Sequence, residues 1–181
     1  MTRIFLTLAL VSSALLLSAF WLGWKIGDPT AREASVQGDV AWHFLTAVAA
    51  ICSAVLVHAL VLTYFMGTGR WLEETCRAYR LADSWQARSR ELKWRLYPGM
   101  TASLLLLIAA GALGAAADPA SAIGFQGFGG FTASQVHLAA VSLTLVFNLA
   151  INVLEFQALL RNGELVEEVM SEIRRMRLEQ G

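Results

Sequence analysis

Residues 133–160 read ASQVHLAAVSLTLVFNLAINVLEFQALL, and this stretch decides the fold. At about 1.5 Å rise per residue it forms a helix of roughly 42 Å, longer than the roughly 30 Å hydrocarbon core of a bilayer. Polar side chains recur along it at steps of 7, 4, 4 and 3, on one helical face: His137, Thr144, Asn148, Asn152 and Glu155. Polar groups are costly in lipid, so we expect this face to meet protein partners inside a bundle.

An earlier stretch repeats part of this pattern. A shift of 94 residues pairs His43 with His137, His58 with Asn152, Gly69 with Gly163, and Glu73-Glu74 with Glu167-Glu168. Asp28-Pro29 and Asp118-Pro119 match at a shift of 90. We interpret the chain as two helical hairpins repeated in parallel orientation about an axis along the membrane normal. His43 and His137 are then expected to face each other at the same depth.

The composition indicates a membrane protein. The chain has 181 residues, of which 56% are hydrophobic and 15% charged, far more apolar than an ordinary soluble domain. Four apolar runs predict an all-α, four-helix transmembrane bundle that occupies the whole chain, with spans at about 4–24, 40–66, 100–117 and 133–160. A cleaved signal peptide is the alternative interpretation of the first run.

Local signals predict where the helices begin and end. Asp39 is expected to cap the second span, and Thr132 with Gln135 forms a capping box before the fourth. The Gly67-Thr68-Gly69 sequence predicts a break in the second helix, and Tyr97-Pro98-Gly99 is expected to end the polar segment before the third span.

Two polar segments set the predicted orientation. Residues 70–99 carry seven basic and four acidic residues, interleaved with Trp, Tyr and Leu, which predicts amphipathic helices lying on the membrane surface. Residues 161–178 continue the last helix with an apolar stripe that favours either self-association or packing on the 70–99 segment: Val166, Val169, Ile173 and Met176. Because basic residues concentrate in these two segments, both termini are expected in the cytoplasm, as in a bacterial inner-membrane protein.

The two outer histidines are candidate ligands. Two imidazoles from neighbouring hairpins can bind one haem b iron from opposite sides, and we name His43 and His137 as these ligands. Small residues beside them would leave room for a flat macrocycle: Ala47, Ala50 and Ala140. A non-haem metal such as copper or zinc, and a purely structural role for the pair, are the alternatives.

A second polar cluster is expected nearer the cytoplasmic side, formed by His58, Asn148, Asn152 and Glu155. We favour a hydrogen-bonded network that holds the second and fourth helices in register. The alternatives are a proton path, a five-coordinate haem on His58 and a quinone pocket. A second haem between His58 and Asn152 is not expected, because an amide is a poor iron ligand.

Several runs resemble haem-binding membrane proteins of the HemJ and copper-resistance-D type. They are His43-Phe44-Leu45, the sequence ELKWRLYPGM of residues 91–100 before a span that contains Gly111, and Val136-His137-Leu138. The resemblance covers residues 40–150 and implies a haem b held by histidines in a redox protein, with His43 and His137 as ligands. The chain lacks that family's Trp-x-Gly after the first histidine and its Lys near the last. The spacing of 15 between His43 and His58 is similar to that of di-haem cytochromes b, with one ligand replaced by Asn152.

No soluble-enzyme motif competes with this interpretation, since the chain contains no Gly-rich phosphate loop, no HExxH and no nucleophile elbow. The sequence therefore predicts a cytochrome b-like electron-transfer protein in the lipid bilayer, with a quinone or a redox protein as partner and no nucleic acid. The alternative is a cofactor-free accessory or scaffold subunit that forms a homo-oligomer or joins a larger membrane complex.

Overall fold

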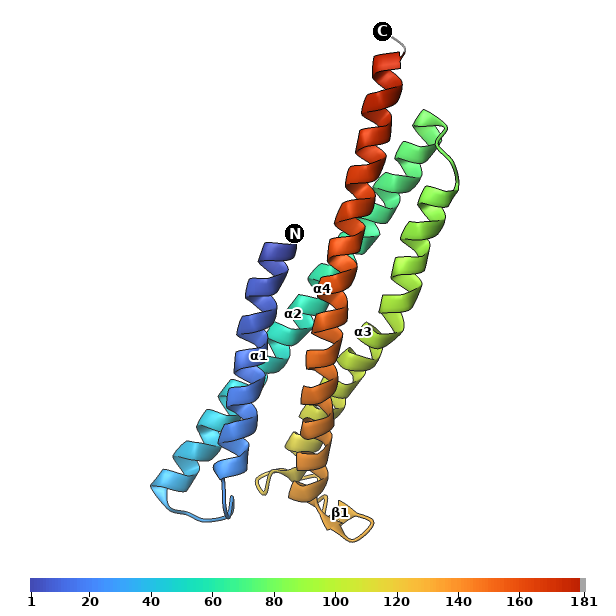
Figure 1. Cartoon of the computed structure of the whole chain (residues 1–181). Coiled ribbons are helices and arrows are strands. Elements are labelled where there is room, and N and C mark those ends of the chain that lie inside the picture. The colour runs from blue at the N-terminus through green and yellow to red at the C-terminus, as the bar shows by residue number, and fades with distance from the viewer. Residues whose placement is uncertain (180–181) are drawn as a thin grey trace.

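The computed structural model describes residues 1–179 and is an all-α bundle (Figure 1). Its helices are α1 (Thr2–Lys25), α2 (Ala34–Tyr79), α3 (Ser84–Ala117) and α4 (Ala133–Glu179). Between α3 and α4 lies a small antiparallel hairpin of β1 (Gly127–Phe128) and β2 (Phe131–Thr132). The two ends of the described chain lie toward the same end of the bundle.

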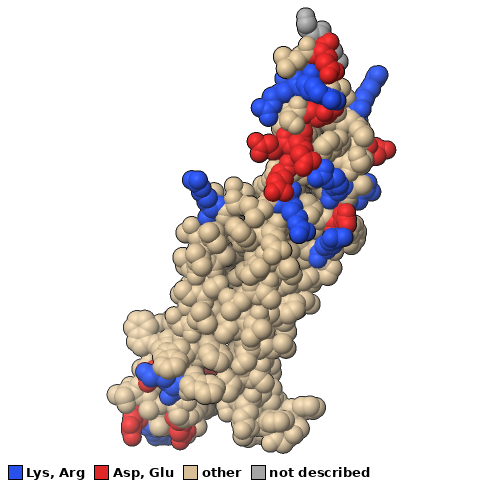
Figure 2. All heavy atoms as spheres, in the orientation of Figure 1, with Lys and Arg blue, Asp and Glu red and all other residues tan. Residues whose placement is uncertain are grey.

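All four described helices are long and apolar enough to cross a membrane. Much of their apolar surface faces outward, as shown by Leu10, Ile108 and Val146, each of which is more than 60% exposed. Figure 2 shows the corresponding charge distribution: charged side chains gather at the two ends, and the surface between them is almost free of charge. This pattern is typical of a bundle whose middle is solvated by lipid rather than by water.

The bundle is built from two antiparallel hairpins, α1 with α2 and α3 with α4 (Figure 1). Its central apolar core draws on all four helices, with Phe5 from α1, Phe65 from α2, Met100 from α3 and Leu159 from α4. Each of these side chains is at most 3% exposed.

Beyond this core, α2, α3 and α4 continue as a three-helix projection. Val169 of α4 packs with Leu72 of α2, and Trp85 of α3 lies against the same cluster. The projection is therefore formed by packing of the C-terminal helix on the 70–99 segment, one of the two arrangements that the sequence left open. The expected surface helices are instead direct continuations of α2 and α3.

The predicted break at Gly67-Thr68-Gly69 was wrong, because α2 runs through it without interruption. Phe65 and Leu72, on either side, are both buried, so packing offsets the weak helix propensity of glycine. The Thr68 hydroxyl donates to the Tyr64 carbonyl at 2.9 Å and accepts from Asn162 of α4 at 3.1 Å.

The predicted boundary at Pro98 was also wrong, because Pro98 lies inside α3. Proline removes one backbone hydrogen bond and crowds the carbonyl four residues earlier, here that of Trp94. Trp94 is 73% exposed, and the buried Leu96 and Met100 anchor the helix around the proline. Tertiary packing therefore outweighs the local penalty.

The helix starts gave mixed results. The capping box before α4 is confirmed: Gln135 N–H donates to Thr132 Oγ1 at 3.3 Å, and Thr132 N–H donates to Gln135 Oε1 at 2.9 Å. The cap predicted at Asp39 was wrong, because α2 begins at Ala34 with Glu33 as its N-cap. The helical ladder starts there, with Gln37 N–H donating to the Glu33 carbonyl at 3.1 Å.

Candidate functional site

His43 and His137 lie side by side at the end of the bundle away from the two termini (Figure 1), and we call them the outer histidines for this reason. His43 is near the start of α2 and His137 near the start of α4, and both are half-buried. Their ring centroids are 6.4 Å apart, with the ring planes at 74°. The structure therefore brings together two imidazoles that are 94 positions apart in the chain.

His43 turns its Nδ1 toward the backbone of the preceding helix, and His137 makes no equivalent hydrogen bond among the described residues. His43 Nδ1 lies 2.9 Å from the Ala19 carbonyl of α1. Because a carbonyl only accepts, this contact places the proton on Nδ1 and leaves a lone pair on Nε2. The Ala110 carbonyl of α3 lies beside the His137 ring, although His137 Nδ1 has no partner at hydrogen-bond geometry among the described residues.

Two glycines make room for the rings. A Cβ atom at Gly23 of α1 would lie 2.7 Å from Cε1 of His43, and one at Gly114 of α3 would lie 2.9 Å from Cε1 of His137. Both distances are shorter than real Cβ contacts allow. The chain thus places the same feature, a histidine ring seated on a glycine of the preceding helix, in each hairpin. The sequence predicts close helix contact at Gly114 in the third span, but the histidine rings that pack on Gly23 and Gly114 were not predicted.

The three predicted small residues line the same end of the bundle. Ala47 follows His43 by one turn and Ala140 follows His137 by one turn, and both are half-buried. Ala50, two turns below His43, has no exposed surface. The alanines nearest the rings therefore keep the surroundings of the histidine pair free of bulky side chains on these faces.

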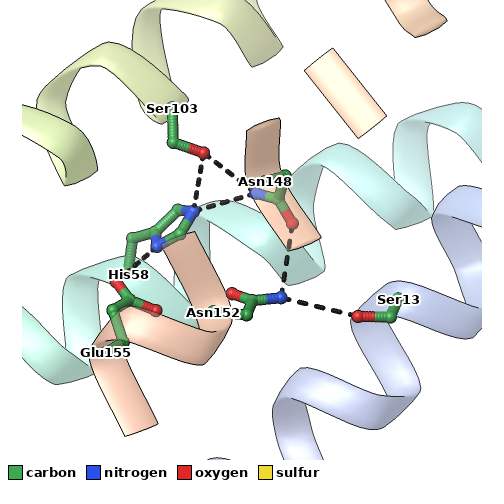
Figure 3. A network of polar contacts seen from close by, with 6 residues as sticks. All are labelled: Ser13, His58, Ser103, Asn148, Asn152 and Glu155. Carbon is green, nitrogen blue, oxygen red and sulfur yellow. Dashed lines mark hydrogen bonds and ion pairs between the residues drawn. The ribbon is translucent and has the colours of Figure 1, made fainter. Parts of the chain in front are cut away.

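The second predicted cluster is brought together in the core of the bundle (Figure 3). His58 Nδ1 lies 2.6 Å from Oε1 of Glu155, and His58 Nε2 lies 2.9 Å from Nδ2 of Asn148. Asn152 Nδ2 donates to Oδ1 of Asn148 at 3.4 Å. His58, Asn148 and Glu155 have no exposed surface, and Asn152 is 8% exposed.

Two serines that sequence analysis did not single out extend this network. Ser103 Oγ of α3 lies 3.1 Å from His58 Nε2 and accepts from Asn148 Nδ2 at 3.0 Å. Ser13 Oγ of α1 accepts from Asn152 Nδ2 at 3.5 Å. One network therefore joins α1, α2, α3 and α4 (Figure 3). Serine is common in membrane helices, so neither position carried a sequence signal.

The donors and acceptors fix the state of His58. The Asn148 amide nitrogen donates, so His58 Nε2 accepts and the ring proton lies on Nδ1, facing the Glu155 carboxylate. Both ring nitrogens of His58 are thus engaged by protein groups. The arrangement suits exchange of a proton between imidazole and carboxyl, but it leaves no lone pair for iron.

Two oxygens of this network lack a partner among residues 1–179: Oε2 of Glu155 and Oδ1 of Asn152. Both are buried, so each retains an unused acceptor inside the bundle.

Comparison with known proteins gives no relative for this chain: no family model, no curated protein and no solved structure matches it.

Proposed function

We propose that this chain is an integral membrane b-type haem protein with an electron-transfer role, in which His43 and His137 are the axial ligands. The pairing of their rings at 6.4 Å between centroids carries this proposal. An imidazole nitrogen binds a metal at about 2.0 Å, so two rings that ligate one ion from opposite sides have their centroids roughly 6 Å apart. The observed separation is of this size.

The hydrogen bonding of His43 supports the same role. A metal-binding histidine almost always donates its other ring N–H to a carbonyl or carboxylate, which fixes the ring and leaves a lone pair for the metal. His43 has this arrangement through the Ala19 carbonyl. A haem needs only two axial ligands from the protein, and the pair supplies two imidazoles.

The proposed internal repeat accounts for the symmetry of the site. Ala19 and Gly23 correspond to Ala110 and Gly114 at a shift of 91 residues, and His43 corresponds to His137 at a shift of 94. Each hairpin would then contribute one histidine, one carbonyl and one glycine to a site on the pseudo-axis. The repeat predicts equal depth for the two ligands, as a single haem requires.

The charge distribution supports the proposed orientation. The basic residues of 70–99 and 161–178 belong to the three-helix projection. Because segments rich in Lys and Arg face the cytoplasm, we propose that the projection and both termini lie on the cytoplasmic side of a bacterial inner membrane. The histidine pair then lies near the outer face. A haem at this depth would exchange electrons with a quinone or with a redox protein of a larger membrane complex.

The test is an absorption spectrum of the detergent-purified protein from haem-replete cells, oxidised and then reduced with dithionite. We expect a sharp reduced α-band, and loss of that band in both His43→Ala and His137→Ala. The control is His58→Gln, which leaves both proposed ligands in place and should keep the band. A colourless wild-type protein, or a band that survives His137→Ala, would contradict the proposal.

A cofactor-free scaffold is the second candidate function, and the polar network that joins all four helices favours it. Such a network gives the bundle a unique packing without any bound group. The scaffold alternative predicts a colourless, folded protein that co-purifies with a partner membrane complex, or as a homo-oligomer, whether His43 and His137 are present or replaced.

A further inference from the structure

A polar pocket lies in the projection between α2 and α3, far from both histidine sites. Its volume is about 250 Å³, and it is lined by Gly69, Glu73, Gln86, Ser89, Arg90 and Lys93. This volume is roughly that of eight water molecules in the liquid, which is room for a small hydrated group. Nothing in the proposed haem chemistry uses this pocket.

The ammonium group of Lys93 is held against Gly69. A Cβ atom at Gly69 would lie 1.8 Å from Lys93 Nζ and 2.6 Å from its Cε, so the lysine head occupies the space that any other residue at 69 would fill. Lys93 is half-buried, and its side chain reaches from α3 to the backbone of α2. The glycine thus fixes a positive charge at one wall of the pocket.

The positive charge of the pocket is not neutralised. The neighbouring arginines form ion pairs with glutamates, as in Arg70 with Glu74, Arg77 with Glu73, Arg88 with Glu168 and Arg95 with Glu91. Arg90 and Lys93 have no ion-pair partner within residues 1–179. Glu73, the acidic residue that lines the pocket, lies 3.4 Å from Arg77 outside it. The wall therefore presents two cations and a carboxylate that already has a partner.

A buried hydroxyl points to a ligand. Ser89 is 3% exposed, lines the pocket, and its Oγ has no hydrogen-bond partner in the described chain. The same Oγ is 3.8 Å from the Cβ position of Gly69, beside the Lys93 ammonium. A buried hydroxyl without a partner is rare in folded proteins, and it becomes satisfied if a bound group supplies an acceptor.

The pocket lies at the level of lipid headgroups. Gly69 is three residues beyond the apolar run that ends at Met66, which is about 4.5 Å along the helix. The polar layer of each leaflet extends about 5–8 Å beyond the hydrocarbon core. Basic pockets between membrane helices at this depth suit the phosphate of an anionic lipid.

We propose that this pocket binds a phosphate group, either the headgroup phosphate of an anionic phospholipid or a free phosphate. Lys93 and Arg90 supply the charge, and the Ser89 hydroxyl donates a hydrogen bond to a phosphate oxygen. The site is independent of the proposed haem, and it serves either to anchor the projection to the bilayer or to sense a soluble phosphate compound.

The experiment is a thermal-unfolding titration of the delipidated full chain in uncharged detergent. The probes are inorganic phosphate, short-chain phosphatidylglycerol, and the diacylglycerol with the same chains, which lacks the phosphate. A ligand that binds only the folded state raises the melting temperature, and the stabilisation grows with the logarithm of 1 + [ligand]/Kd. We expect concentration-dependent stabilisation by phosphatidylglycerol, by inorganic phosphate or by both, and none by diacylglycerol.

Four variants localise the effect. Lys93→Gln should weaken phosphate binding at least tenfold, and Gly69→Ala should weaken it less, because its methyl group displaces only the far end of a flexible lysine side chain. The matched controls are Arg95→Gln, whose arginine pairs with Glu91 outside the pocket, and Gly67→Ala, where a Cβ meets nothing within 4 Å. Both controls should bind like wild type.

Comparison of the phosphatidylglycerol and inorganic phosphate titrations also distinguishes the two sources of phosphate. Stabilisation by phosphatidylglycerol alone identifies a lipid headgroup, and stabilisation by inorganic phosphate identifies a site that takes soluble phosphate as well. Absence of stabilisation by both probes, or equal stabilisation of wild type and Lys93→Gln, would overturn the proposal. Neither result depends on whether the purified protein contains haem.

Discussion

The two histidine sites use the same side chain in opposite ways. At the outer site, His43 bonds through Nδ1 to a backbone carbonyl, and no described residue bonds to the Nε2 of His43 or His137. At the inner site, both nitrogens of His58 are engaged, one by Glu155 and the other by Asn148 and Ser103. The outer rings are half-buried and the inner ring has no exposed surface.

This difference indicates that the outer histidines are available to bind a ligand, whereas the inner histidine stabilises the bundle. A lone pair left on an imidazole nitrogen is available to a metal, whereas a lone pair that accepts a hydrogen bond inside a bundle holds helices together. The inner site links all four helices through side chains, and the outer site links hairpins only through ring contact. We therefore expect substitutions at the inner site to act on stability and those at the outer site to act on binding.

The largest stability effect is expected at Glu155. Glu155→Leu removes the acceptor of His58 Nδ1–H in the buried core, so it should lower the free energy of unfolding by about 2 kcal/mol. This exceeds the roughly 0.6 kcal/mol average of interhelical hydrogen bonds in membranes, because the buried Nδ1–H of His58 is left without an acceptor. The measurement is reversible unfolding in mixed micelles.

Glu155→Gln is the matched control for this prediction. The glutamine carbonyl can accept the His58 Nδ1–H, so the loss should be less than half that of Glu155→Leu. The double variant His58→Leu, Glu155→Leu should cost less than the sum of the two single variants, since each single variant leaves a partner unsatisfied. Strict additivity would show that the pair does not couple and would reduce the network to separate contacts.

An intermediate effect is expected at the two glycines under the outer rings. Gly23→Ala and Gly114→Ala place a methyl group less than 3 Å from the ring of His43 or His137, so each ring must move. Overpacking of this kind costs about 1–3 kcal/mol, of which the better helix propensity of alanine offsets up to about 1. Both variants should therefore destabilise by about 1 kcal/mol in the same unfolding assay.

Gly163→Ala provides the control, because a Cβ there meets nothing within 4 Å. It should stabilise α4 by up to about 1 kcal/mol. Near-equal losses of unfolding free energy for Gly23→Ala and Gly114→Ala would agree with the proposed repeat. A loss for only one of the two variants would argue against it.

The apolar runs and the polar stripe of α4 were enough to predict four long helices and the membership of the inner cluster. Both signals predicted the structure correctly because each depends on the periodicity of many residues, so a single atypical residue does not change it. The same reasoning found the capping box at Thr132, a local motif with a local cause. It could not predict helices that continue through Gly67-Thr68-Gly69 and Pro98, since there the packing of Phe65, Leu72 and Met100 overrides the local signal.

The partners of the polar residues were harder to predict than the residues themselves. Ser13 and Ser103 join the network only because α1 and α3 pass beside α2 and α4, and a single serine in an apolar run does not reveal its neighbour. The side chains that pack on Gly23, Gly69 and Gly114 were not predicted, for a related reason. Each of these glycines is defined by the side chain that occupies its empty space, which comes from another helix.

The smallest effect is expected at the surface of the projection, where Arg88 of α3 meets Glu168 of α4. Arg88 donates two hydrogen bonds to the Glu168 carboxylate, at 2.6 and 3.3 Å, and these bonds hold the pKa of Glu168 below its ordinary value of 4.5. Because the pKa is lower in the folded state, the pair stabilises the fold above pH 4.5 and loses this contribution as the pH falls below that value. The pair is exposed, so its effect should be smaller than that of either glycine substitution.

Arg88→Gln tests this prediction through melting temperatures measured between pH 7 and pH 3. The variant should melt slightly below wild type at pH 7, and the difference should vanish as the pH falls and Glu168 becomes protonated. Arg70→Gln is the control, because Arg70 pairs with Glu74 on the same helix and holds no second helix in place. If the difference between wild type and Arg88→Gln stayed constant down to pH 3, the ion pair would not contribute to the docking of α4. The projection would then be held by its apolar contacts, which include Leu72, Leu165 and Val169, and by the hydrogen bond between Asn162 and Thr68.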